Sequence, residues 1–420
     1  MKNKKNKKFK VLVLSDHALS TSGVGTQTRH LIQGLLEKKQ WSFRQFGAAI
    51  KHTNYDTVVV SEDFIIKPID GFGNPELIRL TLATEKPDLL FIFTDPRFFT
   101  WLFEMEDEVH QMCPIIWWHV WDNYPYPDFN DDYYYATDTI NCHSHMTYTM
   151  IKEDEKHAEK TFFIPHAIPT SWFSPIDKNS ILENKKGLLG EDRKDHFVGI
   201  WVNRNAKRKR PNDALLAWKL FLDDLERDHG HRNATLIMHT EPTDQEGPDL
   251  FSVTKKLGIQ NNVFFSRDRL EFDKMNILYN ISDVCLTLSF AEGFGLSTLE
   301  SMMTGTPIVA AKTGGLTRQV VDFRDQSENG VALPVVLKTL VGSQGVPYIY
   351  EDYVSVEDAA AGLRKIHDLS DNEKEKLSKK VLNYSKEAFS YQKTVDLWHD
   401  SMIKTIKDFK SYRSWEKITI

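Results

Sequence analysis

Cysteine is scarce in this chain of 420 residues, which contains three, Cys113, Cys142 and Cys285. They lie far apart in apolar surroundings and lack the paired spacing of a metal-binding cluster. This scarcity excludes a disulfide-rich secreted scaffold. We therefore expect three buried free thiols in a reducing compartment.

Long hydrophobic runs are also missing. No apolar segment approaches the ~18 residues that a membrane-spanning helix needs, and the run at residues 11–14 is too short for the core of a signal peptide. We therefore predict a cytoplasmic protein without a transmembrane segment, with a peripheral membrane location as the alternative.

The chain has no overall excess of basic charge. Its net charge is −6, with 41% hydrophobic and 27% charged residues, which is typical of a globular protein without a global field for nucleic acid. The local exception is a basic tail, residues 1–10, which we predict to be disordered or in weak contact with an anionic surface. Its lysines are Lys2, Lys4, Lys5, Lys7, Lys8 and Lys10.

The length predicts roughly two to three domains of about 150 residues. Apolar strands at residues 11–14, 87–93 and 114–118 each precede polar or aromatic residues, as in a parallel sheet. A glycine turn at Ser22–Thr26 leads from the first strand into a helix. These features predict a first α/β lobe over residues 11–175.

The same alternation of strands and helices recurs over residues 197–390, which we predict to be a second α/β lobe. Residues 176–196 are polar and lack clear periodicity, so they are predicted to be the linker. Apolar residues recur at near-helical spacing over residues 391–420, which indicates a C-terminal helix. We assign no role to residues 331–351.

The most informative stretch is Ala291–Glu300, where two glutamates bracket a Gly-Phe-Gly turn between a buried strand and a helix. Backbone N–H groups at a helix N-terminus are unpaired and carry the positive end of the helix dipole. Glycine also lets the main chain approach a ligand closely. A diphosphate is therefore a natural ligand for this turn.

The pattern Glu292-x7-Glu300 with Gly-Phe-Gly-Leu inside it resembles the signature of retaining GT-B glycosyltransferases, in the large family of glycosyl transferases group 1. This resemblance implies an α/β fold of two Rossmann-like lobes with a cleft between them and a C-terminal helix that crosses back to the first lobe. Other segments that match are Asn261–Ser266, Leu278–Asp283, Gly305–Val309 and Thr313–Gly315.

The resemblance implies metal-independent transfer of a hexose from a nucleotide diphosphate sugar, with UDP-glucose or GDP-mannose favoured, to an acceptor hydroxyl. The first lobe would bind the acceptor and the second lobe the donor. Asp-x-Asp, the usual metal ligand of the other large glycosyltransferase fold, is missing, so we expect no metal and no cofactor. The acceptor stays open: a glycan, a lipid, a small molecule, a protein or a modified nucleic acid base.

The segment Asn203–Arg210 resembles the family's phosphate clamp, with the two expected cations at Arg204 and Lys209. Fixed cations favour the charge that grows on a leaving diphosphate. Arg210 stands where glycine is common and Arg208 adds a further cation, so which basic residue touches which phosphate is open. A solvated basic loop is the alternative.

The two glutamates have different expected roles. Glu292 would accept hydrogen bonds from donor-sugar hydroxyls and place negative charge near the oxocarbenium ion; alternatively it pairs with the basic loop. Glu300 would bind the ribose hydroxyls; alternatively it forms a helix capping box with Ser297. The remaining donor-binding residues are predicted to be Gly25, Gly293, Phe294, Gly295, Leu296 and Ser297.

His119 follows a predicted strand of the first lobe and resembles the family's histidine near the reacting sugar. A packed, hydrogen-bonded core histidine is the alternative. Gly25 belongs to a Gly-x-Gly loop that resembles the family's first-lobe glycine loop, although this short motif is common.

Other functions require motifs that can be sought in the sequence. A Rossmann dehydrogenase would need a third glycine where Thr28 stands and an acidic residue near position 45, and the sequence has neither. A sugar-nucleotide epimerase or a phosphorylase of the same architecture stays open, as does a glycosyltransferase acting on modified nucleic acid bases. A non-catalytic nucleic-acid-binding protein is supported only by the lysine tail and residues 207–210.

Overall fold

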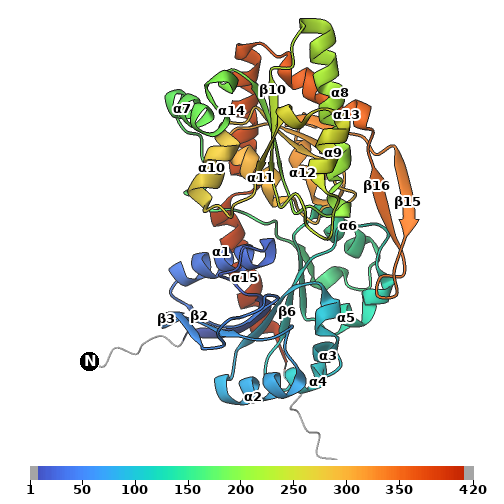
Figure 1. The fold of residues 1–420 in the computed structure, drawn as a ribbon. Coiled ribbons are helices and arrows are strands. Elements are labelled where there is room, and N and C mark those ends of the chain that lie inside the picture. Colours follow the sequence, from blue (N-terminus) through green and yellow to red (C-terminus); the bar gives the residue numbers. More distant parts are fainter. Residues whose placement is uncertain (1–7, 411–420) are drawn as a thin grey trace, which may run out of the picture. The chain divides into compact units, whose positions relative to one another are not determined.

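The computed structural model describes residues 8–410, which fold as two compact units (Figure 1). Within these residues the first unit comprises 8–167, 343–347 and 391–410, and the second comprises 168–342 and 348–390. Most of the predicted lysine tail lies outside the described residues, as do residues 411–420.

The first unit is built on an eight-stranded sheet in the order β3-β4-β2-β1-β5-β6-β7-β8, parallel except for the pairing of β3 with β4. Its central strands are apolar runs buried on both faces, as expected where helices cover both sides of a parallel sheet. The strands are β1 (Phe9–Asp16), β2 (Trp41–Ala48), β3 (Val58–Ser61), β4 (Phe64–Pro68), β5 (Leu89–Thr94), β6 (Ile115–His119), β7 (Thr139–Cys142) and β8 (Thr161–Phe163).

The helices of the first unit come from both ends of the chain (Figure 1). They are α1 (Gly23–Glu37), α2 (Pro75–Glu85), α3 (Thr100–Phe103), α4 (Glu106–Val109), α5 (Asp131–Tyr135), α6 (His145–Glu153) and α15 (Tyr391–Asp408). The Tyr391 hydroxyl donates to the His30 carbonyl of α1 at 2.7 Å, and the Thr405 and Thr139 hydroxyls lie 2.7 Å apart. The predicted return of the C-terminal helix to the first lobe is therefore confirmed.

The second unit contains a six-stranded parallel sheet in the order β11-β10-β9-β12-β13-β14. Its strands are β9 (Phe197–Val202), β10 (Ala234–His239), β11 (Val263–Ser266), β12 (Val284–Thr287), β13 (Ile308–Ala311) and β14 (Gly330–Leu333). Its helices are α7 (Lys178–Leu189), α8 (Pro211–His229), α9 (Leu250–Leu257), α10 (Phe272–Asn280), α11 (Leu296–Met303), α12 (Thr317–Val320), α13 (Val356–His367) and α14 (Asp371–Ala388). This arrangement confirms the predicted α/β fold of two Rossmann-like lobes.

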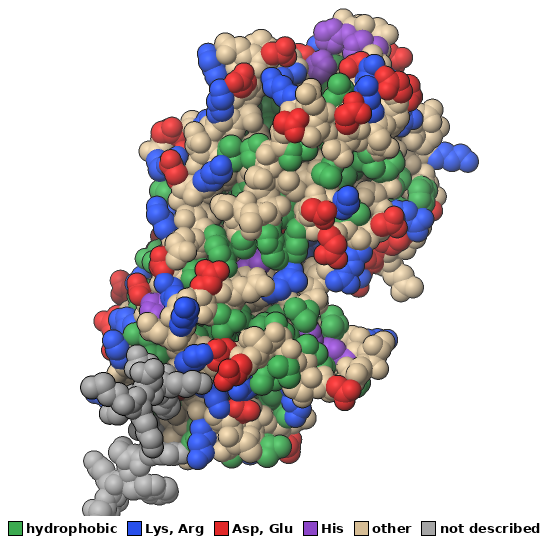
Figure 2. Space-filling view, turned by 90° about the vertical axis from the view of Figure 1, so that its left-hand side faces the viewer, with side chains coloured by type: hydrophobic (Ala, Val, Ile, Leu, Met, Phe, Trp, Pro, Cys, Tyr) green, Lys and Arg blue, Asp and Glu red, His purple; other side chains and the backbone are tan. Residues whose placement is uncertain are grey.

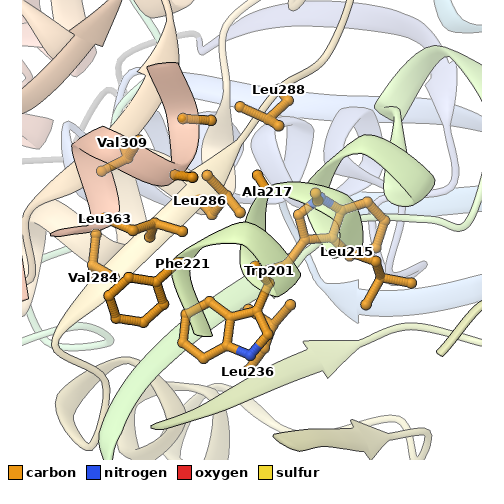
Figure 3. Close-up of a cluster of buried hydrophobic side chains, with 14 of the residues drawn as sticks. Trp201, Leu215, Ala217, Phe221, Leu236, Val284, Leu286, Leu288, Val309 and Leu363 are labelled. Atoms are coloured by element: carbon orange, nitrogen blue, oxygen red, sulfur yellow. The ribbon is translucent and has the colours of Figure 1, made fainter. Parts of the chain in front are cut away.

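The core on one face of the second sheet shows how sequence pattern becomes packing (Figure 3). Trp201 and Leu286 come from strands β9 and β12, whereas Phe221 and Leu363 come from helices α8 and α13, and all four are fully buried. Burying a side chain of this size contributes about 1.5–3 kcal/mol. The sheet is therefore held firmly, and the loops at its strand ends start from fixed points.

Two predicted boundaries differ from the structure. Residues 176–196, expected to be a linker, contain helix α7, and the two units divide between residues 167 and 168. Asp177 caps this helix by accepting from the Ser180 N–H at 2.9 Å, and Leu189 is the one residue of the helix that is buried. The helix is largely polar and therefore lacks the apolar stripe by which a sequence pattern is recognised.

The basic tail is also shorter than predicted. Lys10 lies inside β1 and its Nζ donates to a carboxylate oxygen of Glu85 at 2.7 Å, while Lys8 pairs with Asp63. Both lysines therefore belong to the folded unit, because a strand extends to Phe9. No helix of the described residues is long and apolar enough to cross a membrane.

Residues 331–351, which had no assigned role, form the end of β14 and most of an antiparallel hairpin. Its strands are β15 (Leu337–Val341) and β16 (Ile349–Tyr353), paired from Leu337 opposite Tyr353 to Val341 opposite Ile349. They form a separate two-stranded sheet (Figure 1).

Candidate functional site

The Gly-Phe-Gly turn lies in the second unit between the end of β12 and the start of α11. Gly295 is the N-cap residue with φ 90° and ψ 69°, a left-handed conformation that glycine adopts without strain. The Gln319 side chain donates to the carbonyls of Phe294 at 2.6 Å and of Gly295 at 3.1 Å. The turn is therefore held in one conformation, with the first N–H groups of α11 directed to the end of the helix.

The capping-box interpretation of Glu300 is wrong. The positive φ of Gly295 makes this residue the cap, so α11 begins at Leu296 and Ser297 already lies within the helix. The Glu300 side chain instead accepts a hydrogen bond from the Tyr279 hydroxyl at 2.7 Å. Since no side chain of the described residues caps α11, its N-terminus stays available to an anion.

The carboxyl group of Glu300 is largely removed from solvent. Its side chain keeps some contact with solvent, yet burial raises its pKa to about 7. The hydrogen bond from Tyr279 lowers the pKa, but by less than burial raises it. Near neutral pH the carboxyl group is therefore divided between its neutral and charged forms. A ligand that donates hydrogen bonds to it would favour the charged form.

Glu292 and Lys209 form a buried ion pair, with exposed fractions of 7% and 8%. The Ser289 hydroxyl donates to the same carboxylate oxygen of Glu292 at 2.7 Å. Burial alone would raise the Glu292 pKa, but the charges of Lys209 and Arg208 lower it below the ordinary value. The structure thus brings two predicted site residues together as charged groups, in the pairing that the alternative interpretation of Glu292 described.

Arg204 takes no part in that ion pair. Its side chain is 63% exposed and binds the Asp244 carboxylate with two hydrogen bonds of 2.8 and 3.1 Å. An exposed arginine held by a single carboxylate can turn toward a ligand at small cost. Its phosphate-binding role stays a prediction.

A second glycine loop packs on the Glu292 turn. The Gly315 N–H donates to the Glu292 carbonyl at 2.8 Å. A Cβ atom at Gly315 would overlap the Gly293 carbonyl oxygen and the Phe294 Cα. The Thr313–Gly315 segment, which matches a family segment in the sequence, therefore packs directly on Gly293 and Phe294, and position 315 has no room for a side chain.

His119, predicted to act on the sugar, is completely buried at the end of β6 in the first unit. One ring nitrogen lies 2.7 Å from the Tyr134 hydroxyl, and its ring centroid lies 4.2 Å from that of Trp117. Burial, reinforced by His143, holds its pKa well below the usual range, so the imidazole is neutral. This environment fits a packed, hydrogen-bonded histidine, and a contact with the sugar stays a prediction.

Gly25 lies in the first turn of α1. Its N–H donates to the Ser22 hydroxyl at 2.9 Å, and a Cβ atom there would clash with Ser20 and with the His17 carbonyl. Close packing of the loop after β1 explains this glycine, and contact with the donor stays a prediction.

Three residues of the site were not predicted from the sequence. Tyr279, which donates to Glu300, stands in the matched Leu278–Asp283 segment, so a signal for it was present. Gln319, which holds the turn, and Asp244, which holds Arg204, carry no motif that would mark them. Their roles depend on the fold alone.

A possible metal-binding group lies elsewhere on the second unit, where histidines gather at one end of it (Figure 2). Ligand atoms of His229, His367 and Asp368 lie within 4.8 Å of one another. However, the Arg364 guanidinium donates to His229 at 2.8 Å and to Asp368 at 2.6 Å. An arginine thus occupies the place that a cation would take, and we assign no metal to this group.

Two Rossmann-like units, with a glycine turn after a strand of the second, are typical of the GT-B architecture. Sucrose-phosphate synthase from Thermosynechococcus elongatus aligns with a TM-score of 0.71 and 14% identity over 95% of this chain and 100% of that chain. HepE from Anabaena, solved in complex with UDP and glucose, aligns with a TM-score of 0.68 and 15% identity over 94% of this chain and 100% of that chain.

The match to a protein family lies in the second unit. Residues 189–336 match the family model described as glycosyl transferases group 1. The D-inositol 3-phosphate glycosyltransferase of Corynebacterium diphtheriae is 36% identical over 127 residues, which are 30% of this chain and 29% of that protein. The chain therefore matches about a third of the length of such curated relatives.

Proposed function

We propose that this protein is a retaining glycosyltransferase that moves a hexose from a nucleotide diphosphate sugar to an acceptor hydroxyl. The observation that carries the proposal is the Glu292–Lys209 ion pair beside the uncapped N-terminus of α11. An anion-binding helix end, a fixed cation and a carboxylate are the groups that a sugar diphosphate requires.

In the proposed mechanism the diphosphate binds at the N-terminus of α11, against the N–H groups of Leu296 and Ser297. Lys209 turns from Glu292 toward the leaving phosphate, where its charge stabilises the transition state more than the ground state. Glu292, already charged, is then free to accept hydrogen bonds from sugar hydroxyls and to stabilise positive charge on the anomeric carbon.

Glu300 is proposed to accept hydrogen bonds from the ribose hydroxyls in its charged form. Arg204 and Arg208 are proposed to add positive charge around the phosphates after Arg204 leaves Asp244. The proposed transfer uses no metal, because the side chains already supply the positive charge that a cation would provide.

UDP-glucose is the favoured donor, with GDP-mannose as the second choice. Support comes from the structural neighbour HepE, whose structure contains UDP and glucose. The acceptor is left open, because the curated inositol phosphate transferases match only about a third of their length. We propose that the first unit binds the acceptor.

The experiment incubates the full-length protein with UDP-glucose and with GDP-mannose, in the presence of EDTA, and follows release of nucleotide and free sugar. We expect slow donor hydrolysis without an acceptor, with retained anomeric configuration measured by NMR. Glu292→Gln is the matched control, because it keeps the shape of the side chain and removes its charge. Donor consumption that needs free phosphate, or conversion to an isomeric nucleotide sugar, would replace this proposal by a phosphorylase or an epimerase.

A further inference from the structure

Arg210 has an unusual backbone for its residue type. Its φ is 51° and its ψ is 50°, a left-handed conformation that is strained for a residue with a Cβ atom. The residue is buried, with an exposed fraction of 7%. A strained conformation of this kind persists only where the surrounding contacts enforce it.

The contacts of the Arg210 side chain include residues at the end of strand β16. The Arg210 guanidinium lies 5.3 Å from the ring centroid of Phe290 and 5.2 Å from that of Tyr353 in strand β16. It also donates to Asp213 at 2.6 Å and to the Val354 carbonyl at 3.2 Å. The Arg210 side chain therefore makes structural contacts within the protein, which explains why a cation can occupy this position without being part of the phosphate clamp.

Phe290 connects the same contacts to the two loops of the proposed donor site. Its N–H donates to the Arg208 carbonyl at 3.0 Å, and its carbonyl accepts from the Asp352 N–H of β16 at 3.1 Å. The rings of Phe290 and Tyr353 lie 4.4 Å apart. Since Phe290 is two residues before Glu292, its contacts with β16 restrict the position of the Glu292 turn.

A second connection reaches the other side of that turn. The Asp352 carboxylate accepts from the Thr313 hydroxyl at 2.7 Å. Two residues later, the Gly315 N–H donates to the Glu292 carbonyl at 2.8 Å. Strand β16 thus contacts the Glu292 loop directly through Phe290, and it also contacts the Thr313–Gly315 loop that packs on the Glu292 loop.

We propose that the β15–β16 hairpin is a brace for the donor site and that Arg210 is the positioning residue that connects it to the Lys209–Glu292 pair. This inference rests on the proposed function. The brace keeps the backbone of Lys209, adjacent to Arg210 in the chain, in a fixed position relative to the Glu292 turn, and a shift of about 1 Å in the position of a catalytic group costs up to about 100-fold in rate. The connection also orders the hairpin, since an isolated two-stranded sheet is marginally stable in water.

Arg210→Gly tests the brace, because glycine adopts the left-handed conformation without strain and keeps the loop backbone possible. We expect kcat to fall about 10-fold or more while the Kd for UDP changes less than about 3-fold, since the interaction lost acts through positioning. Tyr353→Ala should reproduce this result. Tyr353→Phe is the matched control, since it keeps the ring and removes only the hydroxyl contact with Glu351 at 3.2 Å.

Hydrogen exchange of the peptide containing residues 288–296 provides a measurement that does not depend on catalysis. We expect faster exchange in Arg210→Gly and Tyr353→Ala, and wild-type exchange in Tyr353→Phe. Unchanged exchange and unchanged kcat in Arg210→Gly would overturn the brace. Absence of turnover in the wild-type protein would overturn the proposed function, while the exchange experiment would still decide whether the hairpin holds the Glu292 turn.

Discussion

Glu300→Gln separates the electrostatic cost of Glu300 from its use in binding. The carboxyl group has a pKa of about 7 in the folded protein against an ordinary value of 4.5, chiefly because it is buried. A carboxylate with a raised pKa favours the folded state fully below pH 4.5, and that contribution is lost as the pH rises through about 7. At pH 8 the wild-type protein therefore carries the cost of a charged, buried group.

The size of this cost follows from the two pKa values. The difference between 4.5 and about 7 corresponds to about 3 kcal/mol at pH 8, at about 1.4 kcal/mol for each unit of pKa. Because the side chain keeps some solvent contact, we expect about 1–2 kcal/mol in practice. Glutamine has no charge to bury and still accepts from the Tyr279 hydroxyl, so the variant should be more stable than the wild type at pH 8 and similar to it at pH 5.

Binding should change in the opposite direction. Hydrogen bonds from ribose hydroxyls to a charged carboxylate contribute about 1.5–3 kcal/mol, and the amide weakens them, so the KM for the donor should rise about 10-fold or more. In the wild type the same argument predicts that donor affinity rises with pH through about 7, as Glu300 loses its proton. Glu300→Gln should lack this dependence.

The assay is urea unfolding of both proteins at pH 5 and pH 8, with calorimetric titration of UDP at the same pH values. Equal stability differences at the two pH values would show that Glu300 does not carry a charge cost. A wild-type affinity for UDP in Glu300→Gln would refute the ribose contact, whatever the stability result.

Three further predictions concern the same site. Lys209→Ala should reduce turnover about 100-fold, because it removes a cation from the leaving diphosphate, and destabilise the protein by about 3–5 kcal/mol, because it leaves the buried Glu292 carboxylate unpaired. Adding Glu292→Gln should recover stability in urea unfolding without recovering turnover. Full turnover in Lys209→Ala would contradict the phosphate clamp. Arg204→Ala should change the free energy of unfolding by less than about 1 kcal/mol, since its ion pair is exposed, and reduce turnover about 100-fold; unchanged turnover would transfer the role to another cation. Gly315→Ala should abolish UDP binding in a calorimetric titration, because the new methyl group overlaps the backbone of the Glu292 turn, and wild-type affinity would show that this contact yields easily.

Most of the fold could be predicted from local sequence. Apolar runs such as those of β1, β5, β6 and β9 are buried on both faces, so composition alone marks them as strands of parallel sheets. The short or polar elements were missed, among them α7 and the β15–β16 hairpin, because their order depends on contacts with distant segments.

The two glutamates, their spacing and the glycine turn between them could be recognised in the sequence, because these features are local and repeat the pattern of a family. The contacts of each side chain, in contrast, depend on the tertiary fold. In the folded protein Gly295 caps α11 in place of Ser297, Glu300 accepts a hydrogen bond from Tyr279, and the Arg210 guanidinium lies against two aromatic rings. Such contacts join residues far apart in the chain, with separations of 21 positions for Tyr279–Glu300 and 144 for Arg210–Val354, and chain spacing carries no information about them.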